Sequence, residues 1–270
     1  MRGTGGGRSL RGMDGAFDSH TALEWLAWQV ELGATEAIGD APVNRYDAPA
    51  AAPKPAAPAA APPGPVTPEK PDFVDLARQA AKLAGDLEAL EAAVAAFEGC
   101  ELKKGARNTV FCDGNPAARV MIIGEAPGAD EDRRGRPFVG RAGQMLDRMF
   151  DAIGMGRAAP DAEQSLYITN VMPWRPPANR DPTLDEIAMM MPFVERHVEL
   201  AAPDLIVAMG NISCQALLGR KGITRLRGTW ARAFGLPVLP MFHPAFLLRN
   251  PHAKREAWAD LLSLQARLRG

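Results

Sequence analysis

Four short and almost continuous apolar runs constrain the fold of this chain more than any other feature of its sequence. They are RVMII (119–123), LYITNV (166–171), LIVAM (205–209) and PVLPMF (237–242). Such runs, in which apolar residues do not alternate with polar ones, are typical of strands that are buried on both faces. The segments between them are predicted to be helical, over 141–153, 183–200 and 211–219. This alternation predicts an α/β fold, a three-layer α/β/α sandwich around a four-stranded parallel sheet.

The chain ahead of these runs begins with two segments of different composition. Residues 1–20 are rich in Gly and Arg and are expected to form a disordered basic tail. Residues 21–40 hold an amphipathic helix, predicted over 21–38, whose apolar stripe includes Trp25 and Trp28. The stripe either docks on the protein's own core or binds a partner protein.

An Ala- and Pro-rich linker is predicted over 41–70. Residues 48–68 hold eight Pro and nine Ala in 21 positions. This composition favours an extended polyproline II chain and cannot build a packed core. The remaining residues, 71–270, are predicted to form one domain that begins with a helix over 72–97. The N-terminal helix is therefore not expected to be an obligate part of that domain.

Composition places the chain among soluble globular proteins. It is 47% hydrophobic and 23% charged, with a net charge of -1, so its overall charge does not mark a nucleic-acid binder. Its three cysteines cannot build a disulfide framework, which favours a reduced, cytoplasmic setting. No apolar run approaches the roughly 18 residues of a membrane span, and the basic N-terminus lacks the apolar core of a signal peptide. We expect a monomer that does not bind membranes.

Polar side chains follow three of the four predicted strands. Glu125 comes after the first strand, Asn170 lies at the end of the second, and His243 comes after the last. Open parallel sheets place their binding sites at the carboxyl ends of their strands. The three side chains are therefore expected to meet at one edge of the sheet.

Charge is unevenly distributed along the C-terminal third of the chain. Between residues 205 and 255 there is no Asp or Glu, and there are eight cations. These are Arg220, Lys221, Arg225, Arg227, Arg232, Arg249, Lys254 and Arg255. Such a field suits the phosphate backbone of a nucleic acid, and the alternative is an ordinary solvated basic face.

Five motifs together resemble the uracil-DNA glycosylase superfamily and are most similar to its family 4. They are GEAPGADEDRRGRPFVGRAGQMLDRMF (124–150), YITNVMPWRPPANRDPT (167–183), LIVAMG (205–210), RLRGTW (225–230) and HPAFLLRNP (243–251). The resemblance covers about 98–260. It implies a DNA glycosylase of base-excision repair that flips uracil out of DNA, hydrolyses its N-glycosidic bond and leaves an abasic site.

The resemblance also implies how the flipped base is held. Phe138 is expected to stack on uracil, and Asn170 to read its edge, because an amide offers both donors and an acceptor. His243 is expected to donate to uracil O2 and to stabilise the departing anion. The loop residues Ala126 and Gly128 are also assigned to substrate binding. The alternatives are that Phe138 belongs to the core and that Asn170 caps a turn.

Two carboxylates and one loop complete the site that the resemblance implies. Glu125 and Glu131 are expected to offset the positive charge of the sugar or to orient the attacking water. The loop after His243 is expected to enter DNA through four residues: Pro244, Leu247, Leu248 and Arg249. Leu247 or Leu248 is the candidate wedge and Arg249 the candidate phosphate contact, unless both leucines belong to the core.

One departure from family 4 concerns its 4Fe–4S cluster, which is bound by four cysteines. The corresponding positions here are Cys100, Lys103, Trp174 and Met190. One thiolate cannot hold a cluster that needs four ligands. We therefore expect a glycosylase without a cluster, a metal or a nucleotide cofactor, in which Trp174 and Met190 fill the space of the cluster.

Two other hypotheses use the same fold without catalysis. One is a protein that captures uracil-DNA, and the other is a scaffold that acts through helix 21–38. The capture type carries a His-bearing loop near the GEAPG motif, whereas residues 129–136 read ADEDRRGR. Intact Glu125, Asn170 and His243 argue against the scaffold.

Overall fold

The computed structural model describes residues 19–31 and 72–269. The chain divides into two units, Met1–Val66 and Thr67–Gly270. In the first unit, helix α1 spans Ser19–Glu31, and the expected continuation to residue 38 lies outside the described residues. The predicted tail before residue 19 and the predicted linker over 41–70 also lie outside them. The stripe residues Trp25 and Trp28 are exposed, and their rings meet edge to face at 6.4 Å.

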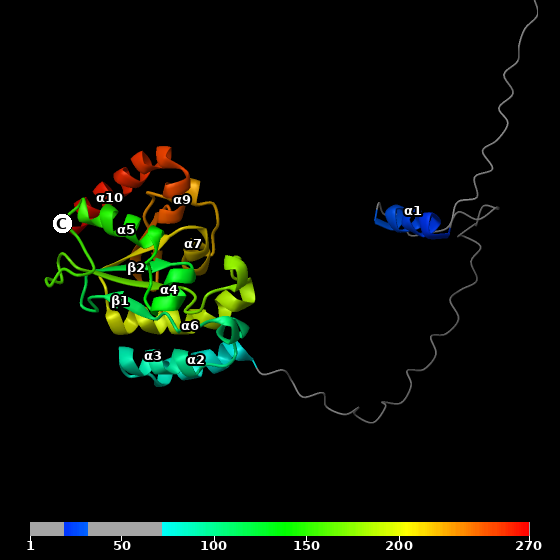
Figure 1. The fold of residues 1–270 in the computed structure, drawn as a ribbon, viewed down its shortest axis with the longest axis horizontal. Helices are drawn as coiled ribbons and strands as arrows, with labels where there is room; N and C mark the ends of the chain where they lie inside the picture. Colours follow the sequence, from blue (N-terminus) through cyan, green and yellow to red (C-terminus); the bar gives the residue numbers. More distant parts are fainter. Residues whose placement is uncertain (1–18, 32–71, 270) are drawn as a thin grey trace, which may run out of the picture. The chain divides into compact units, whose positions relative to one another are not determined.

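The second unit is built on a six-stranded sheet with the order β1-β3-β2-β4-β6-β5 (Figure 1). The four predicted strands are its parallel centre: β2 (Val120–Gly124), β3 (Leu166–Asn170), β4 (Leu205–Met209) and β6 (Leu236–Met241). The prediction of four strands is wrong because two antiparallel edge strands were missed, β1 (Cys112–Gly114) and β5 (Ala231–Ala233). Each has three residues, which is too short to show an apolar pattern.

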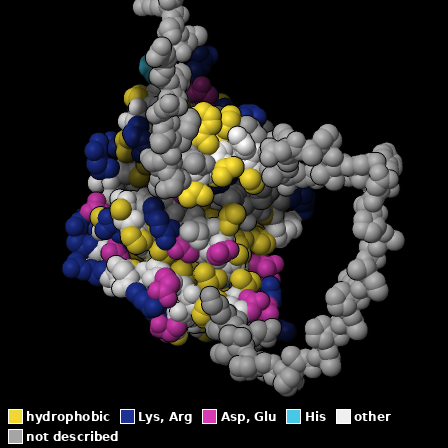
Figure 2. Space-filling view, turned by 90° about the vertical axis from the view of Figure 1, so that its right-hand side faces the viewer, with side chains coloured by type: hydrophobic (Ala, Val, Ile, Leu, Met, Phe, Trp, Pro, Cys, Tyr) yellow, Lys and Arg dark blue, Asp and Glu magenta, His cyan; other side chains and the backbone are white. Residues whose placement is uncertain are grey.

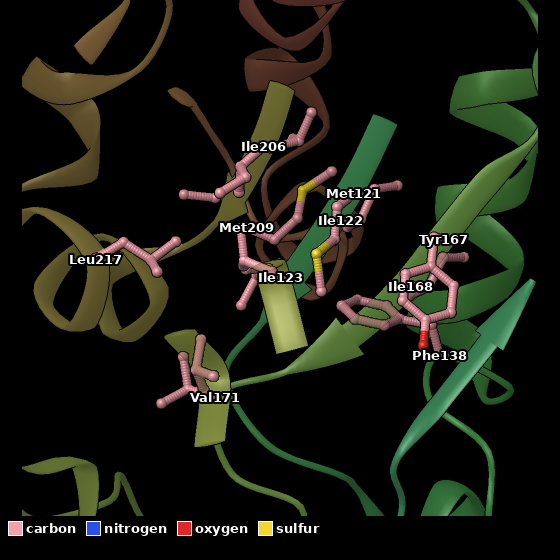
Figure 3. Packing of buried hydrophobic residues seen from close by; sticks show 14 of the residues in the cluster. Met121, Ile122, Ile123, Phe138, Tyr167, Ile168, Val171, Ile206, Met209 and Leu217 are labelled. Carbon is pink, nitrogen blue, oxygen red and sulfur yellow. The ribbon is translucent and has the colours of Figure 1, made fainter. Parts of the chain in front are cut away.

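The central strands form the core, as their composition predicts. Every residue of β2, β3 and β4 is buried. Figure 3 shows side chains of Met121 and Ile122 beside Ile206 and Met209 from the neighbouring strand. The parallel register pairs Gly124 with Asn170, so that β2 and β3 end together at one edge of the sheet. This edge is where the polar side chains were expected to meet.

Helices cover both faces of the sheet, as the sandwich prediction requires. In Figure 1, α6 (Leu184–Ala201) lies below the sheet, and α5 (Arg141–Asp151) and α10 (Lys254–Leu268) lie above it. The other helices of this region are α4 (Ala129–Arg134), α7 (Asn211–Leu218), α8 (Ile223–Leu226), α9 (Pro244–Arg249) and the short 3-10 segments η1 (Glu101–Gly105), η2 (Pro177–Asn179) and η3 (Pro251–Ala253).

The helix predicted over 72–97 is broken into two. Helix α2 spans Phe73–Leu83 and helix α3 spans Leu87–Ala96. Asp86 breaks the run because its side chain accepts a hydrogen bond from the N–H of Ala89 and so starts a second helix. Both helices pack on α6 and add a layer outside the predicted sandwich. Within the described ranges, no helix is both long and apolar enough to cross a membrane.

Candidate active site

A cavity of about 510 Å³ lies at the carboxyl ends of the central strands. Eight of the residues predicted from the sequence line it: Glu125, Ala126, Gly128, Glu131, Phe138, Asn170, His243 and Arg249. They come from segments that are far apart in the chain, and the parallel sheet brings them together. The convergence expected from strand topology is therefore confirmed.

An aromatic ring and an imidazole form one wall of the cavity. The rings of Phe138 and His243 lie 5.5 Å apart between centroids, with 30° between their planes. Phe138 is buried and belongs to the hydrophobic core, as the alternative interpretation expects, but it also lines the cavity. Its backbone is left-handed, with φ of 52°. A Cβ atom at Gly124 would collide with the Phe138 ring and with Asn170 Oδ1. Glycine at this strand end therefore lets the ring and the amide approach each other.

Arg157 was not singled out from the sequence, yet it fixes the backbone around Phe138. Its guanidinium donates to the carbonyls of Pro137 (3.0 Å) and Phe138 (2.9 Å). It also pairs with Asp113 and Asp147, each at 2.8 Å. Four acceptors around one arginine stabilise the unusual backbone of Phe138. Only the fold brings these partners together, so no local sequence signal could have revealed them.

Asn170 is buried, with 7% of its surface exposed, and it lines the cavity. Within 72–269, no hydrogen bond to another residue engages its side-chain amide. Since no fully buried side-chain nitrogen or oxygen of the described residues lacks a partner, the polar atoms of this amide open onto the cavity. Asn170 is therefore available to read a polar edge that enters the cavity, and it does not cap a turn.

His243 is the N-cap of α9, and its Nδ1 accepts a hydrogen bond from the N–H of Ala245 at 3.2 Å. Burial, together with the nearby positive charge of Arg249, lowers the pKa of His243 to about 4. The imidazole is therefore neutral near pH 7. Because Nδ1 is an acceptor, the single proton must reside on Nε2. The side chain thus offers one uncharged N–H donor.

Glu125 is a carboxyl group of the cavity whose pKa is shifted by its surroundings. Burial, with a smaller contribution from the negative charge of Asp181, raises the pKa of Glu125 to about 7, and the positive charge of Lys221 acts in the opposite direction. Asp181 also lines the cavity. A carboxyl group that titrates near neutrality can exchange protons or hold a water at physiological pH.

Glu131 has a different environment from Glu125. One of its oxygens accepts the N–H groups of Val139 (3.0 Å) and Gly140 (2.9 Å), and the other accepts the N–H of Gly128 (3.1 Å). The carboxylate thereby ties the loop after β2 to the loop after Phe138. Both oxygens of Glu131 are thus engaged by backbone donors, and the reactive role expected from the sequence stays a prediction.

The structure contradicts the choice of Leu247 as a wedge into DNA. Leu247 is fully buried in the hydrophobic core, and Pro244, three residues earlier on the same face of α9, is also buried. A side chain so packed cannot enter a base stack without unfolding the helix. Leu248 is half-buried and Arg249 is exposed, so these two of the four proposed DNA contacts are accessible.

The basic field over 205–255 is exposed except at one position. Arg227 pairs with buried Asp260, at 2.8 Å from Nε to Oδ2, and lies 5.7 Å from the centre of the Phe242 ring. Its role is to hold the segment before β5 against α10. The other seven cations are exposed, and two of them, Lys221 and Arg249, act electrostatically on Glu125 and His243.

The residues at the four cluster positions do not fit an iron–sulfur cluster. Cys100 is buried, and burial raises the pKa of its thiol, which disfavours the thiolate that iron requires. Lys103 pairs with Glu98. Trp174 and Met190 are each 1% exposed and belong to the core, and the indole N–H of Trp174 donates to Thr109 Oγ1 at 3.1 Å. In the part of the chain that the structure describes, no three His, Cys, Asp or Glu side chains are grouped to hold a metal.

Because Trp174 is buried, the Trp174→Ala variant should be destabilised by roughly 3–5 kcal/mol, the range for truncating a buried aromatic side chain. Urea unfolding followed by circular dichroism measures this difference. Trp174→Phe, which keeps a ring and loses the bond to Thr109, is the matched control and should lose less. A loss below about 1 kcal/mol for the alanine variant would contradict the packing role.

Fold and cavity together define a class: an α/β protein whose central parallel strands end at a pocket lined by Phe138, Asn170 and His243. The chain belongs to the uracil DNA glycosylase superfamily, whose family model matches residues 111–262. It is 36% identical to a Type-4 uracil-DNA glycosylase of Sulfurisphaera tokodaii over 179 residues, which are 63% of this chain and 79% of that protein. It is 40% identical to a Type-4 enzyme of Thermotoga maritima over 156 residues, 56% of this chain and 77% of that protein. A Type-4 enzyme of Archaeoglobus fulgidus is 36% identical over 172 residues, 60% of this chain and 82% of that protein.

Proposed function

We propose that this chain is a uracil-DNA glycosylase of base-excision repair. It flips uracil out of DNA, hydrolyses the N-glycosidic bond and leaves an abasic site. The observation that carries the proposal is the convergence of Phe138, Asn170 and His243 on one cavity in a chain of this superfamily. Purified protein should cleave the base from a uracil-containing oligonucleotide, which alkali then breaks at the abasic site. An oligonucleotide that stays intact after alkali would reject the proposal.

The cavity supplies one group for each part of the reaction. The Phe138 ring provides a face on which the flipped base stacks, and the Asn170 amide pairs with uracil O4 and N3–H. Cytosine presents an amino group and a bare N3 at these positions, so the amide favours uracil. The Nε2–H of His243 donates to O2, where negative charge develops as the bond to the sugar breaks.

Glu125 acts on the sugar side of the bond. Its carboxylate stabilises the positive charge that builds on the sugar and accepts hydrogen bonds from the attacking water. The ionised form is the active one in this scheme, and burial together with Asp181 disfavours that form at neutral pH. Glu131 contributes indirectly, because it holds the loop that carries Phe138.

This assignment predicts the pH dependence of the reaction. Because the pKa of Glu125 lies at about 7, kcat/KM should rise about tenfold per pH unit below neutrality and level off above about pH 8. His243, with a pKa of about 4, should add no step in this range. Kinetics between about pH 5.5 and 8.5 measure the profile. In Glu125→Gln the rise should disappear; an unchanged rise would assign the titration to another group.

We further propose that residues 71–270 are a self-sufficient catalytic domain, and that the chain works as a cytoplasmic monomer whose N-terminal helix recruits a protein partner. The support is that every cavity-lining residue lies beyond residue 71 and that the apolar side chains of α1 are exposed. Deletion of residues 1–68 should leave excision on short oligonucleotides near that of the full chain. Loss of activity in the deleted protein would show that the helix belongs to the catalytic core.

A further inference from the structure

A second hollow, of about 530 Å³, lies beside the cavity. Three arginines line it: Arg107 from the segment after η1, Arg133 from α4 and Arg175 from the loop after β3. A single carboxylate, that of Asp132, lines it with them. We call this hollow, defined by Arg107, Asp132, Arg133 and Arg175, the arginine groove.

The arginine groove shares a rim with the cavity on two separate segments. In the loop after β2, Gly128 lines the cavity and the next residue, Ala129, lines the groove. In the loop after β3, Arg175 lines the groove and the next residue, Pro176, lines the cavity. Adjacent residues on two segments therefore separate the two hollows, so a chain that leaves the cavity across this rim enters the groove.

Hydrogen bonds build the groove wall and engage its one carboxylate. Asp132 Oδ1 accepts the N–H groups of Arg107 (2.8 Å) and Asn108 (3.3 Å). The Asn108 side chain donates to the carbonyl of Asp132 at 2.6 Å. These bonds fasten the segment before β1 to α4. They also direct one Asp132 oxygen to backbone donors. Three guanidinium groups face a single carboxylate in the lining, so the groove is positively charged.

The arginines keep donors available. Within the described ranges, no residue pairs with the guanidinium of Arg107. Arg175 uses its Nε to donate to Asn179 Oδ1 at 2.8 Å, and Arg133 pairs with Asp130. A guanidinium carries five N–H donors in a planar fork that fits phosphate oxygens. On the face shown in Figure 2, Lys and Arg side chains likewise gather at the left-hand edge, and Asp, Glu and hydrophobic side chains share the centre.

We propose that the arginine groove binds the phosphate backbone of the DNA strand next to the flipped nucleotide. The proposal rests on the proposed function and extends it to residues that the five motifs do not assign to DNA. When a base is flipped out of DNA, the phosphates on either side of it must be held in place. Cations close to the pocket can bind these phosphates without reading the sequence. Continuity with the cavity favours a nucleic-acid strand over an acidic protein, which would have no reason to adjoin the base pocket.

The test measures binding, so it does not depend on catalysis. The full chain with Arg107→Ala, Arg133→Ala and Arg175→Ala combined is compared with a matched triple variant, Arg78→Ala, Arg148→Ala and Arg269→Ala. The three control arginines are exposed and line neither hollow, so both variants lose the same charge. Fluorescence anisotropy with a labelled, undamaged single-stranded oligonucleotide gives Kd between about 50 and 300 mM KCl.

The groove variant should bind at least about tenfold more weakly than the control triple near 0.1 M salt. Its slope of log Kd against log salt should be shallower by about 2, since each phosphate contact on a single strand contributes roughly 0.7. Equal affinities and slopes for the two triples would overturn the proposal. The proposal would also be overturned if the groove variant lost binding to poly-glutamate but still bound DNA like the control triple. That result would assign the groove to an acidic protein. If the groove variant weakens as expected but no form of the protein excises uracil, the proposed function fails and the groove stands.

Discussion

Replacing His243 by alanine is expected to lower the single-turnover rate of uracil excision by about 10²–10³-fold, the loss found when one preorganised donor to a developing anion is removed. The reason is the state of the imidazole. Its pKa of about 4 keeps it neutral, and the bond from Ala245 to Nδ1 leaves the proton on Nε2. The hydrogen bond from this neutral donor to uracil O2 is strongest in the transition state, when O2 acquires negative charge. Its loss should therefore lower the rate much more than the affinity for the substrate.

Rapid quenching with enzyme in excess measures the rate, and anisotropy measures affinity for the same oligonucleotide. His252→Ala is the matched control, because His252 is exposed in η3 and does not line the cavity. It should behave like the unmodified protein. Full activity in His243→Ala would remove His243 from the reaction, and an equal loss of rate and affinity would indicate a role in binding only.

Replacing Asn170 by aspartate is expected to lower uracil excision by roughly 10²-fold, as loss of a buried hydrogen bond to a substrate group costs about 1–3 kcal/mol. Asn170 is buried at the strand end, where the missing Cβ atom of Gly124 leaves room for its amide beside the Phe138 ring. A protonated carboxyl at this position would present the complementary pattern to cytosine. The ratio of cytosine to uracil excision should therefore rise in this variant.

The measurement compares matched oligonucleotides that contain uracil or cytosine at one position. Asn115→Asp is the control, since Asn115 lies ahead of β2 and its side chain accepts a hydrogen bond from Ala117 that aspartate can also accept. Unchanged uracil excision in Asn170→Asp would show that Asn170 does not read the base. If uracil excision falls but the ratio of cytosine to uracil excision does not change, Asn170 contributes to the reaction without selecting the base.

The sequence predicts the centre of this structure well, for a physical reason. Strands buried on both faces must be apolar throughout, so four runs locate β2, β3, β4 and β6, and parallel topology brings Glu125, Asn170 and His243 to one edge. The edge strands could not be predicted in this way. Three residues that pair on one side only carry no pattern, so β1 and β5 appear only in the folded chain.

Residues whose roles depend on distant partners were also missed or misjudged. Leu247 has the right place in its motif for a wedge, but the turn of α9 directs it into the core. The arginines of the groove come from three separate segments, so the sequence does not show that they line one hollow. Arg227, by contrast, sits in a basic run yet pairs with Asp260, which lies 33 residues away. Side-chain direction and long-range pairing decide these cases, and neither is encoded in local composition.

The central claim is that the cavity breaks the bond between uracil and deoxyribose with turnover. The most direct measurement follows a uracil-containing oligonucleotide in excess over protein and quantifies free uracil, abasic sites and protein-bound DNA in the same samples. The account predicts several equivalents of uracil per protein, matched one for one by abasic sites, with the protein recovered free of DNA. No released uracil, or a single equivalent of DNA that stays attached to the protein, would contradict it and identify a protein that captures uracil-DNA without hydrolysing it.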